Sequence, residues 1–458
     1  MKTLLISAAS PDTYRNFFFF EGCLFDQIRA GLNRDPELRV VLVVQPKHYE
    51  QYKDYENHRV IIEQAHKSRP LSRFQKAFTF LYSYLVYTGT TRTLATMGMR
   101  PEDAPGAGKR FLNPLKILIA RTAGRIRWIK RVLVPFAYQA MFQEDEYRAL
   151  IRRYRPHMAF VPHLFSSFDM RLLSAARREG VHTAGMITNW DHFDKYYLPL
   201  HVDRLFVQSE QIKRFAIDYQ AYQESRIMIT GYPYFDFIAD RHYMRPRQET
   251  LRELGFQEGA RYILYVSGSM YCPDEPDVIE EMLSWIDAGE FGHDMHLVIR
   301  PYPGVRGKDL EFDEKKFNDF KDHPRVSFYL GRFWGNVSKS TAFMNMVRYA
   351  DAVAVVYSTA ALEALALDRR VVIPSYDGSR IRPFRRSVKR FELREHFKDL
   401  LLCADIRKAD NSPELRMHLK DAVAGSAVST KSEGSPCGRV TGPLDTLASK
   451  RIFNELMK

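Results

Sequence analysis

A strand-to-helix junction near residue 358 carries the strongest chemical signal in the sequence. The segment 349–374 reads YADAVAVVYSTAALEALALDRRVVIP, in which a buried-type strand ends at Ser358 and Thr359 and a helix of small residues begins at once. The first turn of a helix offers unpaired N–H groups and a positive dipole end, which suit a phosphate. Glu363, one turn inside the helix, could accept hydrogen bonds from ribose hydroxyls. The alternative is that Ser358 only caps the helix and Glu363 is solvated.

A second group of candidate residues follows two expected strands. Gly268 comes directly after Ser267, and a glycine there lets a ligand approach the backbone closely. Arg300 ends its strand beside Pro301 and Pro303, so a fixed guanidinium fork could face a diphosphate and stabilise its developing charge. A salt bridge between domains is the alternative role for this arginine.

Other charged residues near these segments have simpler interpretations. Asp274 and Asp277, in the sequence PDEPD, are expected to cap the following helix rather than hold a metal. Six basic residues follow the strand-to-helix junction: Arg380, Arg382, Arg385, Arg386, Lys389 and Arg390. They could neutralise an anionic ligand or form a solvated basic face.

Alternating strands and helices must position these residues. Short, almost fully apolar strands are typical of parallel sheets that are covered on both faces. The expected strands are 2–8, 38–44, 157–161, 182–187, 204–208, 226–230, 262–267, 295–300, 326–329, 352–357 and 370–374. The expected helices are 16–30, 169–178, 210–219, 277–288, 341–348, 359–367 and 444–457. Two such series predict two Rossmann-like domains.

The domain boundaries follow from changes in composition. We expect an N-terminal domain over 1–240, a polar linker over 241–260 and a C-terminal domain over 261–442. The end of the latter, from about residue 424, is rich in Gly and Ser and is expected to be loose. A helix within 443–458 could pack on either domain.

The positive charge is concentrated in one segment, which we expect to be a helical insertion in the N-terminal domain. The chain has 68 Lys and Arg against 55 Asp and Glu, a formal net charge of +13, and the segment 71–155 alone carries 16 of the former and 5 of the latter. Within it, apolar or small residues recur every three or four positions and predict one basic amphipathic helix: Leu115, Ile119, Thr122, Ile126, Ile129 and Leu133. Such a helix could lie on an anionic membrane, or pack in a bundle with its charges solvated. Nucleic acid is less favoured, since no nucleic-acid-binding motif accompanies the charge.

Composition excludes several classes of protein. With 45% hydrophobic and 27% charged residues, the chain is ordinary for a globular protein, and 458 residues predict two domains. Its four cysteines are far apart and lack zinc-site spacing, so neither a disulfide scaffold nor a zinc site is expected. No apolar run reaches the roughly 20 residues that a membrane-spanning helix needs. We therefore expect a reducing, cytoplasmic location.

Several fragments, in order along the chain, resemble one enzyme superfamily. The segment 349–374 is similar to the donor-site segment of GT-B glycosyltransferases, and ITGYPYFD at 229–236 resembles a segment of UDP-N-acetylglucosamine 2-epimerase-like proteins and surface-polysaccharide transferases. ILYVSGS at 263–269, LVIRPYP at 297–303 and TNWDHFDK at 188–195 are similar to elements of the same enzymes. The resemblance covers roughly residues 155 to 380. It implies an α/β GT-B fold, in which two Rossmann-like domains face each other across a cleft and the C-terminal domain binds a nucleotide-sugar.

Two departures bear on the reaction. The CDP-glycerol glycerophosphotransferase-like enzymes have His where this chain has Tyr302, and Asp where it has Val356. These differences favour a sugar transferase over a polyol-phosphate transferase.

The resemblance also implies roles for individual residues. It places six of them at the donor: Ser267, Gly268, Arg300, Ser358, Thr359 and Glu363. Transfer with inversion needs a base for the acceptor hydroxyl, and Asp191 or His192, after a strand of the N-terminal domain, is the candidate, with Asp194 beside them. Trp190 could stack on a sugar ring. The alternative for this segment is a structural turn.

The first helix offers a further acceptor contact. Arg15 and Asn16 stand at the start of the expected helix 16–30 and would face the cleft in this topology. They could contact an acceptor phosphate or carboxylate, or only cap the helix.

Together these patterns predict a metal-independent glycosyltransferase that moves a sugar from a nucleotide-sugar to a surface polysaccharide or lipid-linked glycan. No cofactor is expected beyond this co-substrate, and no metal. The expected partners are the nucleotide-sugar, the glycan acceptor and the anionic inner face of the cell membrane, and we do not expect nucleic acid. The alternatives are a nucleotide-sugar 2-epimerase-like enzyme, a polyol-phosphate transferase, and a noncatalytic polyanion-binding module.

Overall fold

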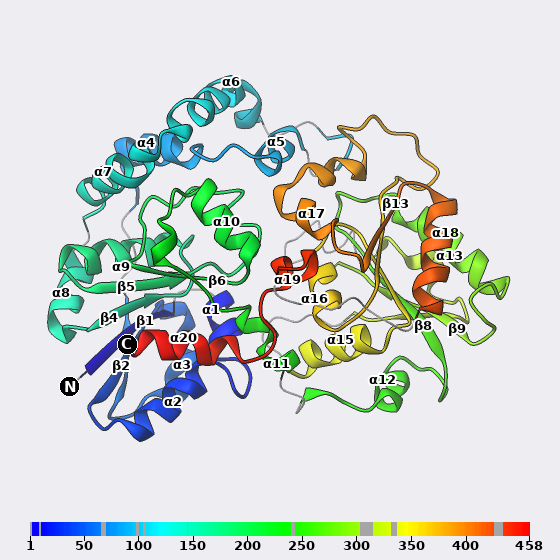
Figure 1. Cartoon of the computed structure of the whole chain (residues 1–458), viewed down its shortest axis with the longest axis horizontal. Coiled ribbons are helices and arrows are strands. Elements are labelled where there is room, and N and C mark those ends of the chain that lie inside the picture. Colours follow the sequence, from blue (N-terminus) through cyan, green and yellow to red (C-terminus); the bar gives the residue numbers. More distant parts are fainter. Residues whose placement is uncertain are drawn as a thin grey trace. The chain divides into compact units, whose positions relative to one another are not determined.

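The computed structural model describes residues 2–8, 11–65, 70–97, 100–103, 107–143, 145–239, 243–302, 315–330, 337–425 and 434–458. The chain divides into two compact units, each built on its own parallel sheet (Figure 1). Unit 1 comprises Met1–Thr91, Leu112–Ala239 and Gly442–Lys458, and unit 2 comprises Arg92–Phe111 and Asp240–Thr441. Pro303 and residues 426–433, which belong to two of the predictions above, lie outside the described residues.

Unit 1 contains a seven-stranded sheet in the order β3-β2-β1-β4-β5-β6-β7. Its strands are β1 (Lys2–Ala8), β2 (Leu38–Val44), β3 (Val60–Gln64), β4 (Met158–Val161), β5 (His182–Met186), β6 (Arg204–Val207) and β7 (Ile227–Ile229). The apolar residues of β1 and β2 are buried throughout, which is how parallel strands covered on both faces behave. On one face, Leu5 and Val43 pack with Ile151 and Leu172 of two helices that follow in the chain.

The helices of unit 1 connect these strands in chain order. They are α1 (Pro11–Phe17), α2 (Leu24–Arg34), α3 (Tyr49–Tyr52), α4 (Arg73–Ser83), α7 (Val134–Met141), α8 (Asp145–Tyr154), α9 (Ser167–Arg178), α10 (Glu210–Asp218), α11 (Asp236–Ala239) and α20 (Ala448–Leu456). The division between the units passes through α5 (Gly89–Thr96) and α6 (Ala107–Arg121).

Unit 2 contains a six-stranded parallel sheet in the order β10-β9-β8-β11-β12-β13. Its strands are β8 (Arg261–Val266), β9 (Met295–Arg300), β10 (Val326–Phe328), β11 (Ala352–Val355), β12 (Val371–Pro374) and β13 (Ile406–Ala409). Its helices are α12 (Arg247–Glu253), α13 (Glu275–Asp287), α15 (Val337–Tyr349), α16 (Ala360–Ala366), α17 (Glu395–Leu400), α18 (Ser412–Ala424) and α19 (Pro436–Thr441). Met282 of α13 and Leu419 of α18 pack in one core on this sheet.

Both sheets follow the strand order of the Rossmann fold. Counted within each unit, the order is 3-2-1-4-5-6, with a seventh strand added in unit 1. The chain reverses its direction of winding between β1 and β4 in unit 1 and between β8 and β11 in unit 2. In open α/β sheets, ligands bind outside the carboxyl ends of the strands at this switch point. The predicted α/β class with two Rossmann-like sheets is confirmed.

The expected helix 16–30 is wrong. Two helices, α1 and α2, occupy this region, and a turn that contains Gly22 at φ +84° separates them. A positive φ is accessible to glycine without steric cost, so the chain can break the helix there. The second helix then continues past Gly31, whose small size accommodates the Phe453 ring of α20.

The single amphipathic helix expected across 115–133 is also wrong. Helix α6 ends at Arg121, a 3-10 turn follows at Ala123–Arg125, and helical structure resumes before a π-helical stretch at Ile129–Leu133 that continues into α7. The break occurs where Gly124 approaches the backbone of Leu85: a Cβ at residue 124 would lie 2.6 Å from the Leu85 carbonyl oxygen. This contact fixes the turn to the core of unit 1.

The last helix belongs to unit 1. The backbone N–H groups of Ala448 and Ser449, in the first turn of α20, donate to the Asp236 carboxylate at 2.6 and 2.8 Å. Asp236 ends the ITGYPYFD segment, so this part of the motif caps a helix more than 200 residues away in the sequence. In the first-turn position the carboxylate also interacts favourably with the helix dipole.

Candidate functional site

The switch point of unit 2 brings two predicted donor segments together. Strands β8 and β11 are hydrogen-bonded neighbours with Val266 opposite Val355, so the residues that follow each strand emerge side by side. A Cβ added to Gly268 would lie 3.0 Å from Val356 Cγ2 and 3.1 Å from Cys272 Sγ. A glycine is therefore needed at residue 268 because the loops that follow β8 and β11 pack closely there. This reason adds to the one predicted from the sequence, that a glycine lets a ligand come close to the backbone.

A buried glutamate that the sequence analysis did not identify holds the loop after β8. Glu275, the first residue of α13, accepts hydrogen bonds from Gly268 N at 2.9 Å, Ser267 Oγ at 3.1 Å and the Tyr265 hydroxyl at 3.1 Å. It also pairs with Lys316, and the two side chains are only 4% and 1% exposed. Ser267 and Gly268 are thus held by a network rather than left as a free loop. No sequence signal links Glu275 to a lysine 41 positions later.

Arg300 lies on the neighbouring strand end but is largely buried. Its carbonyl oxygen accepts from Ser267 N at 3.0 Å, which ties the ends of β8 and β9 together. Its guanidinium lies over the Phe343 ring, 4.3 Å from the ring centroid. Such a cation–π contact holds the arginine side chain in place. The predicted contact between Arg300 and a diphosphate stays a prediction.

The junction after β11 has the predicted strand-to-helix form. Ser358 Oγ accepts weakly from Ala360 N at 3.4 Å, while the Thr359 side chain is exposed and makes no capping bond. Glu363 is half-buried in α16, which has seven residues. The junction therefore follows the strand next to β8, and Val356, two residues before Ser358, approaches Gly268. The donor roles of Ser358, Thr359 and Glu363 stay predictions.

The expected helix-capping roles of Asp274 and Asp277 are corrected by the structure. Asp274 makes no capping hydrogen bond and instead accepts from Arg382 Nε and Nη2 at 2.7 and 2.9 Å. Asp277 accepts from Ser379 N at 3.0 Å. Both carboxylates therefore hold the loop that follows β12.

This loop contains the predicted basic cluster, and half of its members already have partners. Arg382 pairs with Asp274, Lys389 lies 3.4 Å from an oxygen of Asp410, and the buried Arg390 donates to the Ser387 carbonyl at 2.7 Å. The remaining members, Arg380, Arg385 and Arg386, are exposed. Only these three fit the predicted role of attracting an anion from solvent.

The switch point of unit 1 gathers the predicted residues of the first helix. α1 follows β1, and its Asn16 is buried, with a carboxamide oxygen that has no hydrogen-bond partner among the described residues. The Arg15 guanidinium lies 4.8 Å from the centroid of the Tyr234 ring. Neither residue caps the start of a helix, because α1 begins at Pro11. That alternative is excluded, and contact with an acceptor stays a prediction.

The loop after β5 holds the candidate bases. Asp191 pairs with Lys195, four residues later in the same loop. The His192 ring packs 5.0 Å from Phe165, and its Nε2 lies 3.2 Å from Asn189 Nδ2, whereas Nδ1 has no partner among the described residues. Burial lowers the pKa of His192 to about 4, so this imidazole is neutral at physiological pH. A neutral imidazole can accept a proton, whereas the Asp191 carboxylate already forms an ion pair with Lys195.

A second histidine joins this loop to the preceding strand end. His163, which follows β4, has Nδ1 2.8 Å from Thr188 Oγ1, and its ring centroid is 5.8 Å from that of His192. The sequence analysis missed His163 because it lies outside the TNWDHFDK segment. The loops after β4 and β5 therefore carry two adjacent imidazoles close to the switch point.

The flanking residues Asp194 and Trp190 are buried. Asp194 Oδ2 accepts from Thr90 Oγ1 at 2.5 Å, and its carbonyl oxygen accepts from Thr88 Oγ1 at 2.6 Å. This places Asp194 in a structural role at the base of the loop. Trp190 is 3% exposed, so its predicted stacking on a sugar would require the ring to become uncovered.

The side chains of the described residues form no group of three or more His, Cys, Asp or Glu that could hold a metal ion. The four cysteines are free and buried. In the described part of the chain, no helix is both long enough and apolar enough to cross a membrane.

Comparisons with known proteins identify the fold. No family model and no curated protein matches the sequence. Among solved structures, the UDP-GlcNAc 2-epimerase of Methanocaldococcus jannaschii is 10% identical, with a TM-score of 0.52 over 100% of this chain and 99% of that one. The S. aureus MnaA structure with UDP is 11% identical, with a TM-score of 0.50 over 100% and 96%. Another UDP-N-acetylglucosamine 2-epimerase is 12% identical, with a TM-score of 0.51 over 100% and 95%.

These likenesses extend over the whole chain. The two parallel sheets of seven and six strands have the two-domain α/β layout of the GT-B fold, and the predicted fold class is confirmed.

Proposed function

We propose that this protein is a nucleotide-sugar-dependent glycosyltransferase of GT-B type. The observation that carries the proposal is the junction of two loops at the switch point of unit 2, where Gly268 packs against Val356. Rossmann-type sheets bind nucleotides at this position. The Ser267–Gly268 loop and the Ser358–Thr359 junction would receive the diphosphate, with Glu363 placed to accept hydrogen bonds from the ribose.

The proposed reaction transfers the sugar to an acceptor hydroxyl. A base removes the hydroxyl proton, the acceptor oxygen bonds to the anomeric carbon, and the bond from that carbon to the diphosphate oxygen breaks, which releases the nucleoside diphosphate. We assign the base to His192 in preference to Asp191, because the imidazole is neutral and the carboxylate is paired with Lys195. Positive side chains, rather than a metal ion, would stabilise the leaving diphosphate.

The acceptor is proposed to be a surface polysaccharide or a lipid-linked glycan. The switch point of unit 1, with Arg15 and the His163–His192 pair, is where it would bind. A reducing, cytoplasmic location forms part of the proposal, and the four free cysteines support it.

Isothermal titration with UDP-, GDP- and TDP-sugars tests the proposal, with a CMP-sugar, which has one phosphate, as a comparison. We expect one class of donor to bind, and we expect Glu363→Ala to weaken that binding at least tenfold, since it would remove a charged hydrogen-bond acceptor. Glu258→Ala, a change at an exposed glutamate of the same unit, serves as the control. If no donor binds, or if Glu363→Ala and Glu258→Ala are both silent, the proposal is wrong.

A 2-epimerase is the second candidate, and one observation favours it. The three solved structures reported above include two UDP-GlcNAc 2-epimerases that align over almost their whole length. Such an enzyme would convert a UDP-sugar without any acceptor. Incubation of the protein with UDP-GlcNAc alone, followed by NMR of the sugar, separates the candidates: a new epimer favours the epimerase, and unchanged substrate that is consumed only when glycan is added favours the transferase.

A further inference from the structure

The segment 71–155, called the basic insertion below, lies mostly in unit 1 and exposes an unusual number of large apolar side chains. Trp128 is 59% exposed, Phe136 72% and Phe74 81%, values that are high for aromatic residues. Soluble proteins rarely leave such residues uncovered in groups, and contiguous exposed apolar patches mark interaction sites. We define the outer surface by eight of the exposed apolar residues of α4, of α6 and of the helix that contains the π-helical stretch: Phe74, Leu81, Leu115, Leu118, Trp128, Val132, Leu133 and Phe136.

These residues recur at helical spacing. Leu115 and Leu118 lie on one face of α6, and Phe111, in the first half of the same helix, continues the stripe at an interval of four. Trp128, Val132 and Phe136 form a second stripe at intervals of four. Each stripe is the outward face of a helix whose inward face is already packed. Ile119 and Ile129 contact the buried cluster of Leu85, Val86, Val134 and Tyr197.

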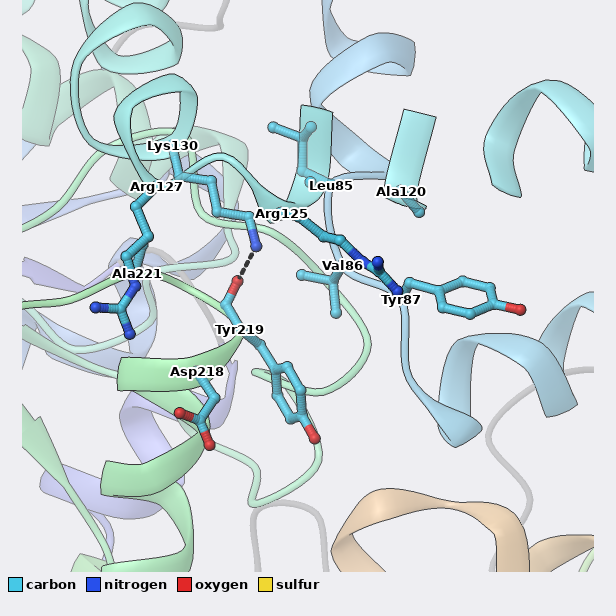
Figure 2. Close-up of a pocket in the computed structure, with 11 residues that line it drawn as sticks. Leu85, Val86, Tyr87, Ala120, Arg125, Arg127, Lys130, Asp218, Tyr219 and Ala221 are labelled. Carbon is cyan, nitrogen blue, oxygen red and sulfur yellow. Dashed lines mark hydrogen bonds between the residues drawn. The ribbon is translucent and has the colours of Figure 1, made fainter. Parts of the chain in front are cut away.

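The insertion is firmly attached to unit 1, so the outer surface is presented by a fixed support. Lys130 is buried and donates to the Tyr219 carbonyl at 2.7 Å, while the Tyr197 hydroxyl donates to the Lys130 carbonyl at 2.6 Å. Arg131 donates to the Ala221 carbonyl at 2.7 Å. These hydrogen bonds tie the π-helical stretch to the end of α10, as Figure 2 shows for Lys130.

The sequence from α6 to α7, which supplies most of this surface, is basic. Between residues 104 and 143 the chain contains eight Lys or Arg and no Asp or Glu. Arg125 and Arg127 alternate with Ile126 and Trp128, and all four side chains are exposed. The side chains of these two arginines form no hydrogen bond or ion pair within the described residues.

A pocket that is lined by three basic residues and one acidic residue, Asp218, lies close in sequence to Trp128 of the outer surface. It has a volume of about 260 Å³ and lies between the insertion and the end of α10. Its lining includes Arg125, Arg127 and Lys130 (Figure 2), and the two arginines extend on opposite sides of the Lys130 ammonium. Burial, followed by the nearby positive charge of Arg127, lowers the pKa of Lys130 to about 8. A bound anion would reduce the electrostatic repulsion between Lys130 and Arg127.

We propose that the outer surface docks on an anionic phospholipid bilayer, with the apolar stripes inserted among the acyl chains and the Arg125–Arg127 pocket placed at the lipid phosphates. The combination of exposed Trp, Phe and Leu with unpaired arginines is the pattern of interfacial membrane helices. Charge complementarity selects an anionic membrane as the occupant. This inference is independent of the proposed transferase activity, because vesicle binding requires no nucleotide-sugar.

Vesicle co-sedimentation of the full chain tests the proposal. We expect binding to vesicles that contain phosphatidylglycerol and little binding to vesicles of phosphatidylcholine alone. The double variant Arg125→Gln/Arg127→Gln should weaken binding about 25-fold, from about 5-fold for each arginine at the surface. Trp128→Ser/Phe136→Ser should weaken it tenfold or more. The control Leu402→Ser/Met417→Ser, at equally exposed apolar residues of unit 2, should leave binding unchanged.

Fluorescence gives a second measurement that does not depend on loss of binding. Brominated lipids should quench part of the tryptophan emission in the wild type, whereas Trp128→Phe should bind normally and lose that quenched component. The proposal is overturned if the wild type does not bind anionic vesicles, or if Trp128→Ser/Phe136→Ser binds them as well as the wild type. It is equally overturned if the same variant instead abolishes a dimer seen by light scattering while vesicles are ignored, since the surface would then join two copies of the chain.

Discussion

The most direct test of the donor-site architecture is Glu275→Gln. Glu275 is the only carboxylate among the described residues that accepts from both Ser267 and Gly268, and it pairs with the buried Lys316. The glutamine keeps the shape of the side chain and an oxygen that can accept from Gly268 N. It removes the negative charge that pairs with the buried Lys316 ammonium.

The expected loss of stability follows from the burial of the pair. Removing one partner of a buried ion pair costs about 3–5 kcal/mol, because the other charge remains desolvated. For a unit of about 200 residues, each kcal/mol lowers the melting temperature by about 2–4 °C, so unit 2 should melt roughly 6–20 °C lower. The nucleotide affinity should fall as well, since the Ser267–Gly268 loop loses its anchor.

Thermal unfolding followed by tryptophan fluorescence measures this effect, because Trp285 lies in unit 2 whereas Trp128 and Trp190 lie in unit 1. Glu280→Gln, at an exposed position of the same helix, serves as the control. Glu275→Gln/Lys316→Met removes both charges, keeps an acceptor oxygen for the donors of the loop, and should recover much of the lost stability. An unchanged melting temperature in Glu275→Gln, or a double variant no more stable than the single one, would refute the reasoning.

Three further predictions concern single side chains. Gly268→Ala should cost about 1–3 kcal/mol in thermal unfolding and weaken donor binding in calorimetry, because the new Cβ lies within 3.1 Å of Val356 and Cys272. Burial raises the pKa of Asp169 to about 7, so between pH 4 and pH 7 the native state holds a proton that the unfolded state has lost. The contribution of Asp169 to wild-type stability should therefore fall by roughly 4 kcal/mol as the pH rises through this window, and urea unfolding should show this fall as the difference between the wild type and Asp169→Asn. If His192 is the base, the acid limb of kcat/KM should lie near pH 4, and His192→Gln should lower kcat by about 10²–10⁴ while calorimetry shows unchanged donor affinity.

Each of these predictions has a contrary outcome. Full donor affinity in Gly268→Ala would mean that the two loops tolerate separation. An identical pH slope in wild type and Asp169→Asn would show that this carboxyl titrates alike in the folded and unfolded states. An acid limb near pH 6.5, or full turnover in His192→Gln, would remove His192 from the proposed mechanism.

The strands that the sequence predicted best are those with continuous apolar runs. β1, β2 and β9 have the expected bounds, because LLIS, VVLVV and LVI can only be buried between two layers of helices. The two strands that were missed, β3 and β13, lie at or near sheet edges and read VIIEQ and IRKA. The charged residues in these two strands interrupt the apolar pattern from which a strand is predicted. Whether such a segment forms a strand depends on the neighbouring strand with which it pairs, more than on its own composition.

The candidate site was predictable where a motif is local, and was missed where it depends on partners far along the chain. The junction at Ser358 and the glycine at Gly268 follow from the strand ends alone. Glu275, His163 and Lys316 became visible only through contacts that the fold creates. Apolar residues do recur at helical spacing across the insertion, as predicted. The chain nevertheless forms separate helices there, because Gly124 lies close to the backbone of Leu85 and a turn breaks the helix at that point.

The position of α20 constrains the order in which the protein can mature on the ribosome. Residues 442–458 complete unit 1, with Asp236 capping α20 and Phe453 packed on Gly31, yet they follow all of the main segment of unit 2 in the sequence. During synthesis, the part of α2 around Gly31 would stay uncovered until about 200 further residues have been made. A fragment that stops near residue 240 would never cover it. Attempts to produce the N-terminal half alone should therefore supply the α20 peptide as well.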